Sequence, residues 1–197
     1  GYIREQLGDF TFRISPRAFY QINPVQTEVL YRTALEYAGL TGTETVVDAY
    51  CGTGTIGIFA SRDAARVIGV ENNRDAVRDA ISNAKANRAD NVRFYTADAS
   101  DFLQDMAKAG EHADVVILDP PRAGSDERFL SAVTTVAPER VVYVSCSPET
   151  LARDLGNLTR HGYRVERIQP VDMFPHTEHI ESVVLLTKAQ KQKCEMT

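Results

Sequence analysis

The sequence predicts one α/β domain built on a doubly wound, mostly parallel β-sheet. The chain of 197 residues is long enough to enclose one substantial hydrophobic core. Between Thr45 and Lys188, short apolar segments alternate with segments of helical periodicity. The apolar segments contain few polar residues, as expected for strands covered on both faces of a parallel sheet.

The N-terminal part of the chain predicts a hairpin and a helix. Residues alternate around Leu7-Gly8-Asp9, so that three apolar side chains share one side of a strand: Phe10, Phe12 and Ile14. Asn23 followed by Pro24 is typical of a helix start, and Gly39 of a helix end. The expected apolar stripe of this helix is Val25, Val29, Leu30, Ala34 and Ala38.

Seven strands and five further helices follow. We expect the strands at Thr45–Ala49, Arg66–Val70, Val92–Tyr95, Val115–Leu118, Val141–Ser145, Tyr163–Pro170 and Ser182–Lys188. We expect the helices at Thr55–Ser61, Arg74–Arg88, Ser100–Lys108, Arg128–Val136 and Pro148–His161. We divide the chain into a hairpin and linker from a missing upstream region (1–18), one main domain (19–188) and a loose tail (189–197).

Composition narrows the class of protein. The three cysteines are too few and too scattered for a disulfide framework or a tetrahedral metal site, which fits a reducing, cytoplasmic setting. No apolar run approaches the roughly 20 residues that a membrane-spanning helix needs. The net charge of −5 is unfavourable for binding RNA. Because the chain begins with Gly1 rather than Met, we interpret it as a fragment or a processed chain. RNA binding would then need either a local basic face that the average charge hides or a missing domain that supplies it.

The turn after the first core strand is the clearest sign of a ligand site. The segment Asp48–Gly57 joins that strand to a helix, and Gly52, Gly54 and Gly57 satisfy the pattern G-x-G-x-x-G. Glycine permits a tight turn and lets a ligand approach the backbone beside a helix N-terminus. Glu71, which ends the second strand, could accept hydrogen bonds from both ribose hydroxyls. The pattern predicts an adenine nucleoside, carried by a dinucleotide or by S-adenosylmethionine.

Two more carboxylates favour S-adenosylmethionine. Asp48 suits the ammonium group of a methionine and would repel a pyrophosphate. Asp98 follows the third strand, where the adenine amino group could be bound. A sulfonium cofactor tolerates these acidic surroundings. Taken singly, each acid could instead be a solvated helix cap.

Three residues at the same predicted sheet edge indicate the chemistry. Asp119 follows the fourth strand and is held by the two prolines after it. Cys146 follows the fifth strand, close to a helix start whose positive end would lower the pKa of the thiol. In a methyltransferase-type sheet the last strand runs antiparallel beside the fifth, which would place Glu181 next to Cys146.

This pair suits methylation of a pyrimidine at carbon 5. A Cys146 thiolate adding at carbon 6 would create an enolate that attacks the sulfonium methyl group, and Glu181 would then remove the proton from carbon 5. Without that context, a lone cysteine is usually a small buried apolar residue and a lone glutamate is solvated. His176 and His179 have poor spacing for sharing a metal ion with Glu181, so we expect no metal site.

These residues resemble one family closely, the RNA 5-methyluridine methyltransferases, which act on transfer or ribosomal RNA. The matching segments, in family order, are Phe19–Asn23, Asp48–Gly57, Asp119–Arg122, Ser145–Thr150 and Asp172–Glu181. Each alone is a weak signal, but together they are specific and cover nearly the whole chain. The resemblance implies a Rossmann-like class I methyltransferase fold: a seven-stranded, mostly parallel sheet with an antiparallel last strand, preceded here by a short N-terminal hairpin.

The resemblance also implies residue roles. Cys146 would be the nucleophile and Glu181 the proton acceptor. Contacts with S-adenosylmethionine are implied for Gln21, Tyr50, Thr55, Glu71, Asp98 and Asp119, and Gln21 would also touch the flipped uracil. The implied reaction methylates carbon 5 of a uridine in RNA through a covalent cysteine–uracil intermediate. We favour ribosomal over transfer RNA and expect a monomer.

One departure and three alternatives remain open. Family members usually carry an N-terminal RNA-binding β-barrel, and often an inserted central domain, so we expect this chain to bind the cofactor but to hold RNA weakly. An RNA 5-methylcytosine methyltransferase would carry a cysteine where Arg122 stands. A nicotinamide-dependent oxidoreductase would leave Cys146 and Glu181 unexplained, and a non-enzymatic cofactor-binding scaffold would not need Cys146.

Overall fold

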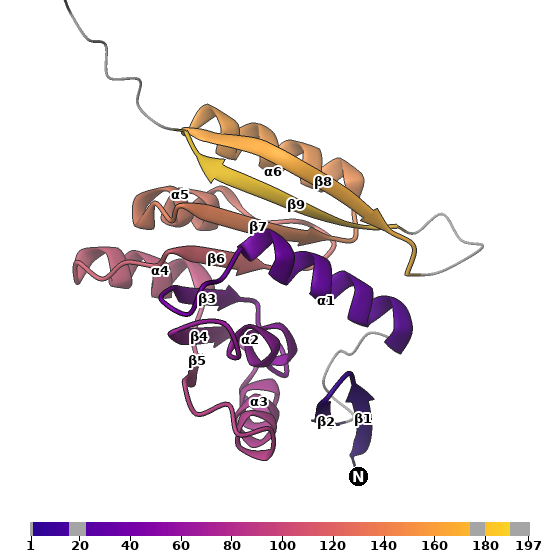
Figure 1. The fold of residues 1–197 in the computed structure, drawn as a ribbon. Coiled ribbons are helices and arrows are strands. Elements are labelled where there is room, and N and C mark those ends of the chain that lie inside the picture. Colours follow the sequence, from indigo (N-terminus) through magenta and orange to yellow (C-terminus); the bar gives the residue numbers. More distant parts are fainter. Residues whose placement is uncertain (1, 16–22, 174–179, 190–197) are drawn as a thin grey trace, which may run out of the picture.

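The computed structural model describes residues 2–15, 23–173 and 180–189, and it confirms the doubly wound α/β fold (Figure 1). Within these residues a seven-stranded sheet has the strand order β5-β4-β3-β6-β7-β9-β8. Its strands are β3 (Thr45–Ala49), β4 (Arg66–Glu71), β5 (Val92–Thr96), β6 (Val115–Leu118), β7 (Arg140–Ser145), β8 (Tyr163–Val171) and β9 (Glu181–Lys188). The first five pair in parallel, whereas β9 is antiparallel to both β7 and β8. The inserted antiparallel last strand is therefore confirmed.

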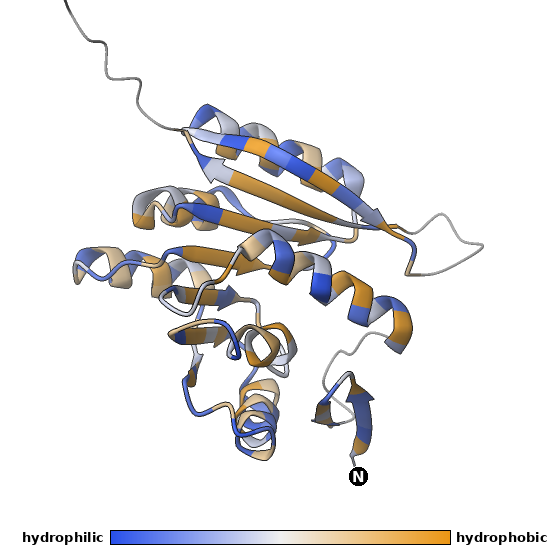
Figure 2. Cartoon of the chain, viewed as in Figure 1, coloured by the Kyte–Doolittle hydropathy of each residue, from blue (hydrophilic) through white to orange (hydrophobic). Residues whose placement is uncertain are grey.

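Helices cover both faces of this sheet, and each face has its own apolar core. One face packs against α1 (Pro24–Ala38), α2 (Thr55–Ala60) and α3 (Arg74–Ala86). The other packs against α4 (Ala99–Lys108), α5 (Glu127–Val136) and α6 (Pro148–Arg160). Figure 2 shows the consequence: the central strands are hydrophobic along most of their length, while α6 and the edge strand β8 mix hydrophilic and hydrophobic residues. Burial of the central strands explains their apolar runs.

The predicted hairpin is confirmed as β1 (Ile3–Leu7) and β2 (Phe10–Ile14), an antiparallel pair in a small sheet of its own. Phe10, Phe12 and Ile14 are buried, as their alternation predicts. The rings of Phe10 and Phe12 lie 4.5 and 6.1 Å from that of Phe59 in α2. These residues belong to the same apolar core as residues of α1 and α2, so the hairpin packs on the main domain.

Helix α1 has the predicted caps but only part of the predicted apolar stripe. The side chain of Asn23 accepts a hydrogen bond from the Gln26 N–H (3.2 Å), and Gly39 ends the helix in a left-handed conformation. Leu30, Ala34 and Ala38 are buried, as predicted. Val25 and Val29 are 72% and 41% exposed, so their prediction is wrong. Thr27, Tyr31 and Tyr37 take the buried positions instead.

The ends of the other elements coincide with the predicted ends or differ from them by one or two residues. The helix predicted to reach Arg88 ends at Ala86, because Asn87 is its cap and Arg88 has a left-handed backbone (φ 55°). Ala189 is held by a hydrogen bond from its N–H to the Gly162 carbonyl (2.7 Å), and the remainder of the predicted tail, 190–197, lies outside the described residues. Across the described ranges, no helix has the length and apolar character needed to cross a bilayer.

Candidate active site

The carboxyl ends of the parallel strands form one edge of the sheet, and the predicted site residues that the structure describes lie along it. Tyr50, Glu71, Asp98, Asp119 and Cys146 end or follow β3, β4, β5, β6 and β7. Glu181 begins β9, whose antiparallel direction returns it to this edge. Loops at this edge are the usual ligand site of an open α/β sheet. Gln21 lies outside the described residues, as do His176 and His179.

The turn between β3 and α2 has the geometry that its glycines predict. Gly52 and Gly54 have φ angles of 53° and 82°, in the left-handed region that glycine adopts without strain. A Cβ at Gly54 would lie 2.6 Å from the ring of Phe94, so the turn also packs too closely for a side chain. The result is a tight backbone loop at the start of α2, on the edge of the sheet.

Glu71 is fixed beside this turn by two backbone hydrogen bonds. The Gly52 N–H donates to Oε2 (3.1 Å) and the Asn73 N–H donates to Oε1 (2.8 Å). The carboxylate is partly exposed. Each oxygen has a further lone pair, so Glu71 can still accept hydrogen bonds from vicinal hydroxyls.

Asp48 is buried at the end of β3, against the start of α2. It is 1% exposed, and the Gly57 N–H donates to its Oδ2 (2.9 Å). Burial, reinforced by the charge of Glu71, raises the pKa of Asp48 to about 7 against the lowering effect of that hydrogen bond. Asp48 therefore ties the end of β3 to α2, and its predicted contact with a methionine ammonium stays a prediction.

Tyr50 and Thr55 sit on either side of the glycines in this turn. Tyr50 has a left-handed backbone (φ 60°), rare outside glycine, and its ring lies 5.1 Å from that of Phe129. Burial raises the pKa of Tyr50 to about 12, which keeps its hydroxyl protonated at neutral pH. Thr55 is 6% exposed, and its hydroxyl lies 3.3 Å from that of Thr53. Their predicted cofactor contacts are compatible with these positions and stay predictions.

Asp98 lies at the outer end of the same edge. Its side chain is 53% exposed and caps α4 by accepting a hydrogen bond from the Asp101 N–H (3.0 Å). It also lies 3.8 Å from the guanidinium of Arg128. Both contacts suit the helix-cap interpretation, while its role in binding adenine stays a prediction.

The register of β7 and β9 brings Cys146 and Glu181 to the same place. Ser145 pairs with Ser182, so the residue after Ser145 and the residue before Ser182 lie at the same end of the two strands. The Ser145 Oγ accepts from the Ser147 N–H (3.1 Å), which holds the backbone on both sides of Cys146. Residues 35 positions apart in the sequence thus become neighbours.

Glu181 is a buried acid with an unsatisfied oxygen. It is 5% exposed, and among the described residues its Oε2 has no hydrogen-bond partner. Burial raises its pKa. Asp119 lies close enough to feel its charge: burial, followed by the charges of Glu181 and Asp48, raises the pKa of Asp119 to about 8. The charges of Glu181 and Asp48 therefore disfavour ionisation of Asp119, and a cation at this edge would relieve that repulsion.

The prediction of a lowered pKa for Cys146 is wrong. Burial raises the pKa of the thiol, the charges of Glu181 and Asp119 raise it further, and Arg122 lowers it only in part. The positive end of α6 does not offset two neighbouring carboxylates together with partial burial. The free chain consequently holds Cys146 as a thiol at neutral pH.

Asp154 in α6 was missed in the sequence and holds the loop after Asp119 against α6 and β7. It is fully buried and accepts hydrogen bonds from the Tyr143 hydroxyl (2.6 Å) and the Ser125 N–H (2.8 Å). A Cβ at Gly124 would lie 2.7 Å from its Oδ2, so the loop after Asp119 packs directly on it. The available signal was an acid within the apolar stripe formed by Leu151 and Leu158.

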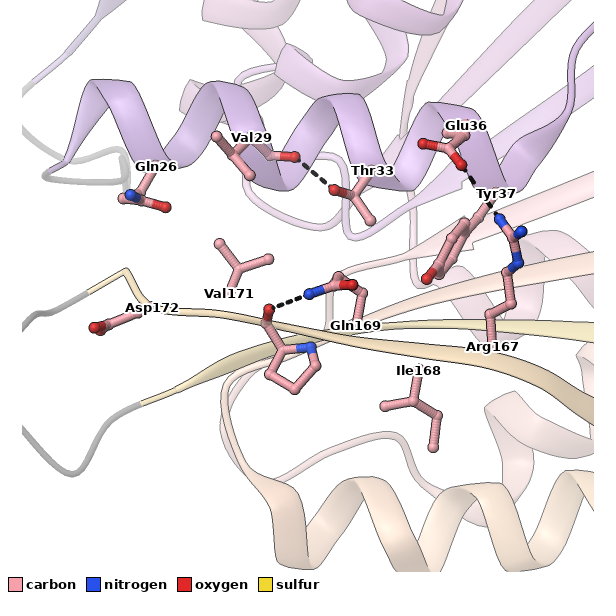
Figure 3. Close-up of a pocket in the computed structure, with 11 residues that line it drawn as sticks. Gln26, Val29, Thr33, Glu36, Tyr37, Arg167, Ile168, Gln169, Val171 and Asp172 are labelled. Atoms are coloured by element: carbon pink, nitrogen blue, oxygen red, sulfur yellow. Dashed lines mark hydrogen bonds and ion pairs between the residues drawn. The ribbon is translucent and has the colours of Figure 1, made fainter.

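A groove of about 580 Å³ lies between α1 and β8, away from these residues (Figure 3). An ion pair between Arg167 and Glu36 (3.2 Å) spans it, and Gln26, Val29 and Asp172 belong to its lining. The lining includes none of the predicted site residues. We therefore place the candidate active site at the strand ends and not in this groove.

Comparison with known proteins places the chain in a family. A family model described as tRNA (uracil-5-)-methyltransferase matches residues 2–189. This chain belongs to that family. The predicted family and fold class are thereby confirmed.

The relatives of the chain include curated proteins and a solved structure. An uncharacterized RNA methyltransferase of Enterococcus faecalis is 52% identical over 187 residues, which are 95% of this chain and 41% of that protein. A similar protein of Clostridium tetani is 50% identical over 94% of this chain and 40% of its own length. The tRNA (uracil-54, C5)-methyltransferase of Pyrococcus abyssi, solved with S-adenosyl-L-homocysteine, is 37% identical with a TM-score of 0.81, over 94% of this chain and 44% of its own. The chain therefore spans about two fifths of the length of these proteins.

Proposed function

We propose that this family member uses S-adenosylmethionine to methylate carbon 5 of a uridine in RNA, as a cytoplasmic enzyme. The observation that carries the proposal is the register of β7 and β9, which places Cys146 beside Glu181 at the edge that also holds the Gly52–Gly54 turn. S-adenosylmethionine would supply an electrophilic methyl group. Its sulfonium charge suits the buried acids Asp119 and Glu181 better than a pyrophosphate would.

In the proposed reaction each residue has one task. The Cys146 thiol loses its proton to solvent, and its sulfur bonds to carbon 6 of the uracil, which moves electron density to carbon 5. Carbon 5 then takes the methyl group, whose bond to the sulfonium sulfur breaks to release S-adenosylhomocysteine. Glu181 removes the remaining proton from carbon 5, the double bond between carbons 5 and 6 forms again, and the bond from carbon 6 to sulfur breaks. Tyr50, Glu71 and Asp119 hold the cofactor against this edge. The target base must leave its stack to reach it.

The substrate RNA remains a choice between two classes. Ribosomal RNA is the class that we favour from the sequence, whereas the family and the Pyrococcus relative are named for transfer RNA. We further propose that the chain is a monomer and that tight RNA binding depends on regions of the longer relatives beyond the stretch it covers. Low ionic strength and a high RNA concentration are therefore appropriate for assays of this chain.

Methyl transfer from labelled S-adenosylmethionine to unmodified ribosomal and transfer RNA tests the proposal. The wild-type chain should produce 5-methyluridine in one of the two RNAs, and Cys146→Ala should lower the rate by roughly a thousandfold or more while retaining cofactor binding. Product at carbon 5 of cytidine, or equal activity of Cys146→Ala, would refute the proposed reaction. A chain that binds a nicotinamide dinucleotide instead would support the oxidoreductase alternative.

A further inference from the structure

On the edge of β2 that does not pair with β1, the backbone forms hydrogen bonds with side chains of α3 and of its C-cap residue. Asp79, Asn83 and Asn87 are spaced four residues apart, so their side chains lie on one face of the helix. Each accepts a hydrogen bond from a backbone N–H of the hairpin segment: Ser15 to Asp79 Oδ2 (2.9 Å), Arg13 to Asn83 Oδ1 (2.7 Å) and Thr11 to Asn87 Oδ1 (3.0 Å). Four residues of a helix advance about 6 Å along its axis, and two residues of a strand advance about 6.8 Å. The spacing of the three helix side chains therefore matches the spacing of the three backbone N–H groups.

The two asparagines also return a hydrogen bond to the strand. Asn83 Nδ2 donates to the Arg13 carbonyl (3.0 Å), and Asn87 Nδ2 donates to the Thr11 carbonyl (2.8 Å). Each amide therefore binds one residue of β2 through both its N–H and its carbonyl, as a paired strand would. Hairpin docking depends on polar contacts with α3 as well as on the buried rings of Phe10 and Phe12.

Asn83 differs from Asn87 by a contact with the candidate cofactor turn. Its Nδ2 also donates to the carbonyl of Thr53 (3.2 Å), the residue between Gly52 and Gly54. Asn83 is 1% exposed, and with this bond both hydrogens of its amide are used. One buried side chain thus holds the backbone of β2 and the backbone of the turn at the same time.

The conformation of this turn depends on such outside contacts. The left-handed backbones of Gly52 and Gly54 give it little stiffness of its own. Within the turn the Gly54 N–H donates to the Cys51 carbonyl (2.8 Å), and Glu71 accepts from Gly52. Asn83 fixes the carbonyl between these two points. Loss of its amide would leave a buried carbonyl without that donor, which is costly.

We propose that Asn83 is a positioning residue for cofactor binding, through which docking of the β1–β2 hairpin and the shape of the cofactor turn are coupled. The inference rests on the proposed function, since S-adenosylmethionine is taken as the ligand of the turn. Coupling between two sites is reciprocal. The docked hairpin raises affinity for the cofactor, and the bound cofactor in turn stabilises the docked hairpin.

Calorimetric titration of the chain with S-adenosylmethionine, comparing Asn83→Ala with Asn87→Ala, tests the coupling. Both variants remove an amide that binds β2, but only the first removes the bond to the turn. We expect the dissociation constant to rise about tenfold in Asn83→Ala and less than about twofold in Asn87→Ala. Equal effects in the two variants would overturn the inference while leaving the proposed function intact. Absence of binding by the wild-type chain would instead refute the proposed function.

Hydrogen exchange of the wild-type chain gives a second test that does not require a variant to fold. Saturating S-adenosylmethionine should slow exchange of the Thr11 and Arg13 amides by about threefold or more, because it stabilises the docked hairpin. Cofactor binding also slows exchange through global unfolding at every amide, so a role confined to stability predicts that these two amides slow no more than those of β8, which lies away from the turn. Slowing no greater than that of the β8 amides would therefore exclude the coupling even if Asn83→Ala is too unstable to study.

Discussion

Glu71 and Glu181 are two carboxylates at the same sheet edge with opposite surroundings. Glu71 ends β4 with both oxygens bonded to backbone N–H groups, whereas Glu181 begins β9 with a buried Oε2 that has no partner among the described residues. A satisfied acid is held in one position, which suits recognition of a ligand. A buried acid without a partner is costly to ionise, so a proton-transfer role explains why one is placed there. We therefore propose that the β3–β4 side of the edge binds the ligand and that the β7–β9 side carries the chemistry.

Replacement of Glu181 should have the largest effect. Glu181→Gln keeps the size of the side chain but removes the base, so turnover should fall by roughly a hundred- to ten-thousand-fold. Cysteine–RNA adducts that carry the methyl group should accumulate, because carbon 5 keeps its proton. Denaturing electrophoresis with labelled methyl groups measures this. Loss of turnover without an adduct would place Glu181 before the covalent step and contradict its role as the base.

Replacement of Glu71 should affect affinity more than chemistry. Glu71→Ala removes a charged acceptor at the turn, and the dissociation constant for S-adenosylmethionine should rise by about tenfold or more. At saturating cofactor the rate of methyl transfer should remain within a few-fold of the wild type. Asp98→Ala, which changes an exposed helix cap, serves as the control and should weaken binding less. A large loss of the methyl-transfer rate at saturating cofactor would show that Glu71 contributes to the chemical step as well as to binding.

A smaller effect is expected on the reactivity of Cys146. The charge of Glu181 raises the pKa of the thiol, so Glu181→Gln should lower that pKa and increase the thiolate fraction at a given mildly alkaline pH. The rate of Cys146 alkylation by iodoacetamide, followed by peptide mass spectrometry over a pH series, should rise a few-fold and its midpoint should shift to lower pH. Asp98→Asn should leave the profile unchanged. A shift toward higher pH would contradict the electrostatic account.

The fold and the proximity of Cys146 to Glu181 could be predicted because each depends on a pattern that one sequence displays. Apolar runs separated by helical periods specify the parallel strands, and one topological rule for the last strand brings Glu181 to Cys146. The direction of the thiol pKa shift could not be predicted from the helix end alone, because the opposing charges come from Asp119 and Glu181, on other elements. Burial likewise depends on which other elements pack against a residue. Val25 belongs to the apolar stripe predicted for its helix, yet it is 72% exposed.

The residues missed in the sequence share a different cause. Asp154 and Asn83 act through hydrogen bonds to backbone groups of distant loops, and a backbone acceptor such as the Thr53 carbonyl leaves no trace in residue type. A polar residue within a buried helix face is the only sign that a sequence gives of such a contact. That sign locates the residue but not its partner.

Mass spectrometry of the chain after incubation with S-adenosylmethionine and RNA containing 5-fluorouridine tests the central claim most directly. Fluorine at carbon 5 cannot be removed as a proton, so the covalent intermediate should persist. The account predicts a peptide containing Cys146 joined to a methylated fluorouridine, and no adduct on Cys51. A chain that binds cofactor and RNA but forms no such adduct would contradict the assignment of Cys146 as the nucleophile.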